Sequence, residues 1–166
     1  EAGTRSYTGK PGENYFQNKA SYDIVADFNP ETGMLKGQEE ITYKNNSPDT
    51  LKQLIIRQYM NLFQKGVERD FNIGTDDLHD GVEIEKLRVN GKEIAPDGSK
   101  FVTQGTISRL WLDTPLRPQD EISLEIHWNV QLPDDVTIRM GKYGEGNWFV
   151  AYWYPHIAVY DDVSGW

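Results

Sequence analysis

The sequence predicts an all-β domain, built as a β-sandwich or as a large curved antiparallel sheet. Short runs alternate between apolar and polar residues with a period of two, and clusters of Gly, Pro, Asn and Asp separate them. No stretch has the helical periodicity over ten to twelve residues that a helix needs. The chain of 166 residues is 37% hydrophobic and 12% aromatic, which is enough for one domain with a core.

The first half of the chain contains three predicted strands. Residues 22–28 alternate cleanly, and residues 29–33 form a turn in which Pro30 presets φ and Gly33 adopts a positive φ. The next strand spans residues 35–44. Residues 51–63 are apolar enough to be one central strand.

The second half begins with residues 64–81, a patternless stretch that we expect to be a surface loop. Asn90-Gly91 is a strong hairpin signal between strands at residues 82–89 and 92–94. Residues 115–120 form a further turn. Three more strands are predicted, over residues 101–103, 106–112 and 121–131.

The last twenty residues carry seven of the chain's aromatic side chains, and they must find a core or a partner surface. Pro155 interrupts this segment, so we expect two extended pieces, residues 148–154 and 156–160. Residues 1–19 are predicted to be a flexible N-terminal arm, and residues 20–166 the β domain. The bulky Trp166 at the end gives the expectation that this domain is incomplete, cut from something longer.

Net charge and composition exclude several classes of function. The net charge of −9 and the pI of about 4.8 argue against binding to nucleic acid or to anionic lipid. No apolar run approaches the roughly 18 residues of a membrane span. The chain has no cysteine, which fits a periplasmic, cell-surface or secreted bacterial protein whose signal sequence has been removed.

The titratable residues show no catalytic or metal site by themselves. The three histidines, His79, His127 and His156, lack the spacing of a helical zinc pair. His127 is expected on a solvated strand face, and only His156, inside the aromatic segment, is a candidate for function. Asp161 and Asp162 are expected in a turn or a salt bridge, because adjacent residues of an extended chain point to opposite faces.

Residues 70–77 have a faint likeness to a calcium-binding loop. Thr75 stands where an EF-hand loop needs glycine, and Gly81 where it needs glutamate. A charged surface loop is therefore the favoured interpretation, and a cation at residues 70–77 or at the Asp161 pair stays open.

Two ordered sets of residues resemble the aminopeptidase N family of zinc metallopeptidases, in its extracytoplasmic bacterial form, and together they cover nearly the whole chain after residue 14. The first set includes Gly37-x-Glu39-x-Ile41-x-Tyr43-x-Asn45-Asn46-Ser47-Pro48. The second ends in Trp153-Tyr154-Pro155-x-Ile157-Ala158-Val159-Tyr160-Asp161-Asp162-x-x-Gly165-Trp166.

The resemblance implies the saddle-like N-terminal β domain of an enzyme that removes N-terminal residues from peptides. In that family a separate catalytic domain holds the zinc through H-E-x-x-H, and that motif does not occur in this sequence. Zinc, the catalytic domain and the peptide substrate are therefore implied partners, and the 166-residue stretch alone should be inactive. The family domain also continues beyond the position of Trp166.

The aromatic segment would then line the substrate cleft or dock the catalytic domain. The candidates for this role are Tyr152, Trp153, Tyr154, His156 and Trp166. Family members often have Gln or Glu at the position of Tyr152, where it helps to hold the substrate's α-amine, so the direct role of this chain in substrate binding is open.

Two alternatives remain at this point. The chain could be a carbohydrate-binding β-sandwich in which Trp153, Tyr154 and Trp166 stack on sugar rings. It could also be the scaffold domain of an inactive peptidase homologue.

Overall fold

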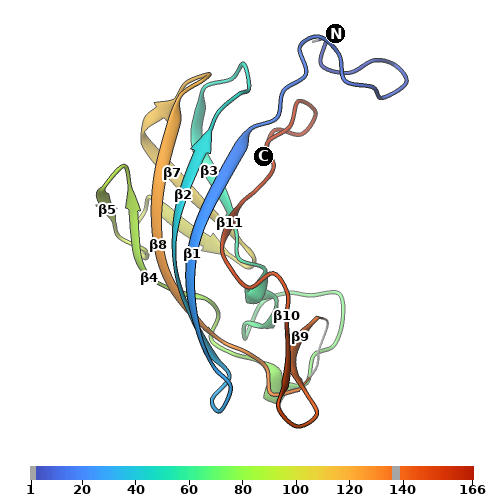
Figure 1. Cartoon of the computed structure of the whole chain (residues 1–166), viewed down its shortest axis with the longest axis vertical. Helices are drawn as coiled ribbons and strands as arrows, with labels where there is room; N and C mark the ends of the chain where they lie inside the picture. Colours follow the sequence, from blue (N-terminus) through green and yellow to red (C-terminus); the bar gives the residue numbers. More distant parts are fainter. Residues whose placement is uncertain (1–2, 136–138) are drawn as a thin grey trace.

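The computed structural model describes residues 3–135 and 139–166 and places them in three antiparallel sheets (Figure 1). Two short 3₁₀ helices are the helical elements of these described residues, in agreement with the predicted all-β fold. The elements are β1 (Lys19–Asn29), β2 (Met34–Lys44), β3 (Leu51–Arg57), η1 (Tyr59–Phe63), η2 (Thr75–Asp77), β4 (Glu83–Val89), β5 (Lys92–Ile94), β6 (Phe101–Gln104), β7 (Ile107–Leu116), β8 (Glu121–Gln131), β9 (Met140–Tyr143), β10 (Asn147–Val150) and β11 (His156–Ile157).

The larger sheet has five strands in the order β1-β2-β8-β4-β5, and its three long strands pair over eleven residues each. The predicted alternation is confirmed, because every second residue of β8 from Ile122 to Val130 is buried. Two predicted turns are confirmed as well: Gly33 has a φ of 70°, and Asn90 and Gly91 both have positive φ in the β4–β5 hairpin. The turn predicted over residues 115–120 starts later, because β7 continues to Leu116.

The second sheet has the order β11-β3-β7-β6. The prediction of one strand over residues 51–63 was wrong in its second half, because β3 ends at Arg57 and the chain turns into η1. Gln58 explains the turn: its amide donates to the carbonyl of Thr106, and its side chain donates to the Ser108 hydroxyl. η1 then inserts Met60 and Phe63 into the end of the core.

One hydrophobic core lies between the two larger sheets and draws buried side chains from both. Trp128 of β8 is its largest member, at 1% exposure. Its ring lies over Gly37 of β2, where a Cβ atom would come within 2.4 Å of the indole. Glycine is therefore required at position 37 for the Trp128 ring to lie flat on the neighbouring strand.

The C-terminal segment differs from the predicted pair of extended pieces. β10 covers only the start of the first piece and pairs with β9, a strand that we did not predict, while residues 151–155 lie outside any strand. The chain then runs along the opening between β1 and β3 (Figure 1). There β11 pairs with β3, and the Ile157 amide donates to the Tyr22 hydroxyl of β1 at 3.0 Å.

The two ends of the described chain lie together (Figure 1). The Arg5 guanidinium donates to the Asp162 carboxylate at 2.7 Å, and Phe16 stacks on Tyr160 at 6.3 Å between ring centroids. Residue 19, placed in the arm by the sequence, begins strand β1. None of the helices in the described residues has the length and apolar character needed to cross a membrane.

Candidate functional site

Three aromatic side chains meet at the surface where β3 ends. Tyr59 is the first residue of η1, Tyr152 lies between β10 and β11, and His156 begins β11. The Tyr59 ring lies 5.3 Å from the Tyr152 ring and 5.3 Å from the His156 ring. Tyr59 and Tyr152 are 38% and 47% exposed, so part of each side chain is available to a partner.

Two of these rings each have an arginine beside them. Arg139 donates to the Tyr152 hydroxyl at 2.7 Å, with its guanidinium carbon 6.0 Å from the ring centroid. Arg57 of β3 is the antiparallel partner of His156 in β11. We name these five residues, in the order Arg139, Tyr152, Tyr59, His156 and Arg57, the tyrosine row.

Two members of the tyrosine row have a strained backbone. Tyr152 has a φ of 53° and Arg139 a φ of 64°, in the left-handed region that bulky side chains rarely enter. They face each other, because the Ala151 amide donates to the Arg139 carbonyl at 3.1 Å in addition to the side-chain contact. Such strain is typical of sites at which a side chain must point in one direction.

Trp153 and Tyr154 support the row from behind. Trp153 lies 5.9 Å from the buried Trp128, and Tyr154 makes an edge contact of 5.6 Å with Tyr22. Both rings are half-buried against the core. They therefore fix the backbone on either side of Pro155 and hold the neighbouring Tyr152 and His156 in place.

Trp166 does not join the other predicted site residues. Its ring packs on Tyr160 at 5.2 Å and on Tyr43 at 6.2 Å, at the end of the molecule that carries the N-terminal arm. The structure thus brings together four of the five residues chosen from the sequence, and it places Trp166 in a separate cluster.

The His156 ring is held as a neutral group. Burial lowers its pKa below the ordinary value, and the nearby Arg57 charge lowers it further. The hydrogen bond between Nδ1 and the Tyr154 carbonyl, at 3.4 Å, acts in the opposite direction. At neutral pH the row therefore carries two guanidinium charges and no carboxylate.

The other two histidines lie outside the row. His127 lies on the solvent face of β8 and contacts Glu125 at 2.9 Å, as its position on the polar face predicted. His79 is buried, and its Nδ1 accepts the Gly81 amide at 2.9 Å. Burial lowers the pKa of His79 to about 4.

The donor set of the described residues does not fit a zinc ion, since no group of three His, Cys, Asp or Glu side chains converges there. Asp161 accepts the amides of Val163 and Ser164 in a tight turn, and Asp162 pairs with Arg5. These are the turn and salt-bridge roles that the sequence predicted for the two carboxylates.

Sequence reasoning missed Tyr59, Arg57 and Arg139. The first two fell within the predicted strand over residues 51–63. Alternation placed them on one of the two faces of that strand and gave no sign of a site. Arg139 shows no pattern at all, because its place depends on the β9–β10 hairpin. Only the density of aromatic residues after position 147 pointed to this region.

A buried carboxyl group in the core was also missed. Glu39 of β2 is 1% exposed, and neither carboxyl oxygen has a hydrogen-bond partner among the described residues. Its backbone lies between Ile24 of β1 and Ile126 of β8. Burial raises the pKa of Glu39 to about 8, so this side chain is neutral over much of the physiological range.

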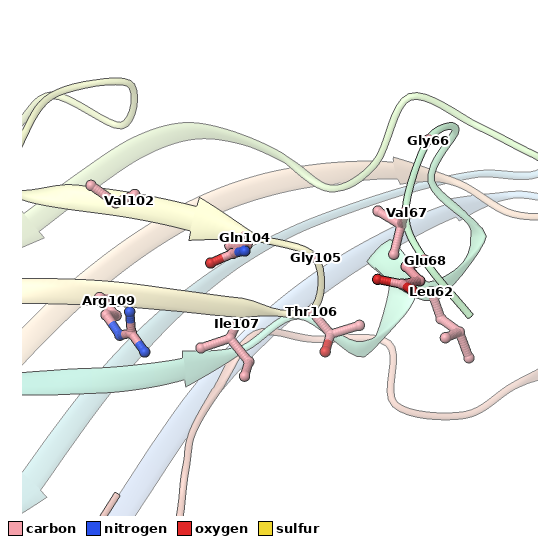
Figure 2. A pocket seen from close by; sticks show the side chains of 10 residues that line it. All are labelled: Leu62, Gly66, Val67, Glu68, Val102, Gln104, Gly105, Thr106, Ile107 and Arg109. Atoms are coloured by element: carbon pink, nitrogen blue, oxygen red, sulfur yellow. The ribbon is translucent and has the colours of Figure 1, made fainter. Parts of the chain in front are cut away.

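A separate groove of 560 Å³ lies at the free edge of β6. Figure 2 shows Val102 and Arg109 on the two strands of the β6–β7 hairpin, and Val67 and Glu68 on the loop that follows η1. The groove has no strained residue and no buried titratable side chain in its lining. It is a weaker candidate than the tyrosine row for these reasons.

Comparison with known proteins finds no matching protein family and no matching curated protein. Solved structures do match. A two-domain M1 zinc metallopeptidase bound to L-arginine superposes with a TM-score of 0.51 at 15% identity, over 82% of this chain and 27% of that chain. The chain's fold resembles part of an M1 zinc metallopeptidase.

Two further structures come from Deinococcus radiodurans. One is an M1 zinc metallopeptidase variant with a TM-score of 0.49 at 16% identity, over 80% of this chain and 25% of that chain. The other is such a variant bound to a Tyr-Ser-Ala substrate, with a TM-score of 0.48 at 17% identity over the same shares. The chain thus spans about a quarter of the length of these enzymes, and identities this low show the fold alone.

Proposed function

We propose that this chain is a non-catalytic domain of a zinc metallopeptidase of the aminopeptidase type. In this proposal the tyrosine row lines the peptide cleft, and the surface around it packs against a catalytic domain that holds the zinc. The chemistry supplied by that zinc, activation of a water molecule for attack on the peptide bond, then lies outside the 166 residues.

The observation that carries the proposal is the tyrosine row itself. Exposed rings held by strained backbone are costly for a protein that uses them only for packing, and aromatic side chains are favoured where surfaces meet a ligand or partner. The fold likeness supports the same assignment, because the similar region is about a quarter of a longer metallopeptidase chain.

The carbohydrate-binding alternative has less support from the geometry. Stacking on a sugar needs a flat exposed ring face. Trp153 and Tyr154 are half-buried against the core, and Trp166 packs on two tyrosines. The rings chosen for sugar stacking are therefore already occupied by contacts within the protein.

Two measurements test the proposal. The 166-residue chain should not hydrolyse aminoacyl anilides, with or without added zinc, whereas the full product of its gene should do so with zinc bound. In that full protein Tyr152→Ala should raise KM for a tripeptide more than it lowers kcat, because Tyr152 lies at the cleft and not at the metal. A full gene product without zinc ligands, or hydrolysis by the short chain alone, would contradict the proposal; the former outcome would favour an inactive scaffold.

The proposal includes an extracytoplasmic location. Its support is the absence of cysteine, which fits an oxidising compartment. Fractionation of cells that carry the native gene checks this point, with recovery in the cytosolic fraction as the contrary result.

A further inference from the structure

The charge of the tyrosine row is opposite to that of the chain as a whole. The chain has a net charge of −9, yet the row carries two guanidinium groups and a neutral histidine. Among residues 3–135 and 139–166, neither Arg57 nor Arg139 forms an ion pair, although eight ion pairs join other Lys and Arg side chains to carboxylates there. Two arginines without ion pairs at one place of an acidic chain form a local positive region that can attract anions.

The geometry of the row fits an extended ligand and not a single ion. Contacts connect the row in series, from Arg139 to Tyr152, from Tyr152 to Tyr59 and from Tyr59 to His156, which pairs with Arg57. The exposed Tyr59 and Tyr152 therefore stand between the two arginines in this series. A guanidinium forms paired, charge-assisted hydrogen bonds with a carboxylate. The rings supply apolar contact for the segment that joins two such carboxylates.

We propose that the tyrosine row binds peptides that carry acidic side chains, with carboxylates pairing to Arg57 and Arg139 and the peptide lying across Tyr59 and Tyr152. This inference rests on the proposed function in taking the ligand to be a peptide, and it adds the preferred chemistry of that peptide. It also gives a role to Tyr152 that needs no contact with an α-amine, since the row contains no carboxylate to hold one. The strained backbone of Arg139 and Tyr152 then serves to aim the guanidinium at the ligand.

A binding experiment tests the inference without relying on catalysis. The probe is an N-acetylated hexapeptide, Ala-Glu-Phe-Ala-Glu-Ala, labelled with tetramethylrhodamine at its carboxyl end, and the comparison peptide has Gln in place of both Glu. The acetyl group protects both peptides from an aminopeptidase. Fluorescence anisotropy with the full protein should give a dissociation constant about tenfold lower for the Glu peptide at low salt. The difference should shrink in 0.5 M salt, because screening weakens exposed charge pairs.

Arginine variants test which side chains cause the preference for the Glu peptide. Arg139→Gln and Arg57→Gln should each lower the affinity ratio of the two peptides about threefold, and the double variant should bring it close to one. Arg117→Gln is the matched control, because Arg117 is exposed at the far end of the sheet, next to Leu116, which pairs with the opposite end of β3 from Arg57. Thermal unfolding of each variant verifies its fold, and Arg139→Lys should restore part of the preference.

Equal affinity for the two peptides, or a preference that survives the double variant, would overturn the inference. Loss of all preference in Arg117→Gln would overturn it as well, by placing the charge effect elsewhere. Binding that follows the expected pattern in a protein that hydrolyses no peptide would leave the inference standing and contradict the proposed function. The two proposals therefore fail in distinguishable ways.

Discussion

The five-stranded sheet and the C-terminal segment are held together by different forces. In the sheet, β1, β2 and β8 pair over eleven residues each, and aliphatic side chains fill the core. In residues 151–166 the chain forms only the two-residue strand β11, and ring contacts, side-chain hydrogen bonds and single backbone hydrogen bonds hold the rest.

The difference separates stability from function in this molecule. Substitutions in the core of a regularly paired sheet lower the free energy of unfolding strongly, because the close-packed neighbours cannot move to fill the space. A segment held by individual contacts can be changed one contact at a time at a small cost, which suits a surface that must adapt to a ligand. The predictions below test whether the two regions respond as differently as this comparison implies.

The largest effect is expected at Glu39, inside the sheet. Its pKa is raised from the ordinary value of 4.5 to about 8, so the folded protein keeps a proton that the unfolded chain releases. Stability should therefore fall as the pH rises from about 4.5 to 8, by up to the order of 5 kcal/mol, and then level off. Glu39→Gln should remove this dependence, so that the variant is the more stable protein at pH 8 and has nearly wild-type stability below pH 5.

Urea unfolding between pH 4.5 and 9 measures this effect as the difference between variant and wild type. Glu40→Gln, on the exposed face of the same strand, controls for the loss of one negative charge. Tyr22 is the other titratable group that senses the Glu39 charge, and its own pKa is raised to about 12, so it stays neutral over this range. If the free energy of unfolding depends on pH in the same way in wild type and in Glu39→Gln, the Glu39 pKa is not raised, and the prediction is wrong.

The second effect compares one tryptophan from each region. Trp128→Ala empties a fully buried position in the sheet and should cost about 3–5 kcal/mol of the free energy of unfolding. Trp166→Ala removes a half-buried ring from the C-terminal segment and should cost about 1–2 kcal/mol. Denaturant unfolding monitored by far-ultraviolet circular dichroism gives both values. Equal costs would mean that the segment is as integral to the fold as the sheet.

The same contrast decides how much the sequence could predict. Alternation in residues 121–131 needs only a period of two and one buried face, and β8 has the expected bounds. The Asn90-Gly91 turn is equally local, since both residues adopt positive φ with little strain. Where local pattern and tertiary packing agree, the strand, its face and its turn can all be predicted.

The candidate site needed information that no local pattern contains. Arg57 is the last residue of β3, and Tyr59 looks like a further residue of the same strand until Gln58 bonds to Ser108 of β7 and the chain bends. Arg139 reaches Tyr152 only because β9 pairs with β10. Glu39 occupies an apolar position of a regular strand, and its lack of partners depends on every neighbouring side chain at once. Composition identified the region, and tertiary contacts chose the residues.

A smaller effect is expected at the joint between the two regions. Tyr22→Phe removes the hydroxyl that accepts the Ile157 amide, leaving that amide without its partner at a part-buried place. The loss should be about 1–2 kcal/mol. Amide hydrogen exchange should rise at Ile157 and at Ala158, whose amide donates to the Ile55 carbonyl, before any change in β8. Uniform acceleration over both regions would show that they open as one unit.

The smallest effect on overall stability should come from Asp162→Asn, at the outer end of the segment. The charge pair between Asp162 and Arg5 is partly open to solvent, and pairs of that kind contribute little to global unfolding because water already screens them. The midpoint of urea unfolding should therefore stay unchanged within error.

The local consequence of Asp162→Asn should be larger, since this charge pair and the hydrogen bond from the Thr4 hydroxyl connect the N-terminal arm to the C-terminal segment. Exchange of the Gly12 amide, which donates to the Thr4 carbonyl, should accelerate severalfold while the amides of β2 keep their rates. A shift of the global midpoint instead would mean that the N-terminal arm unfolds together with the sheet. The part of the molecule that is held by separable contacts would then not include the arm.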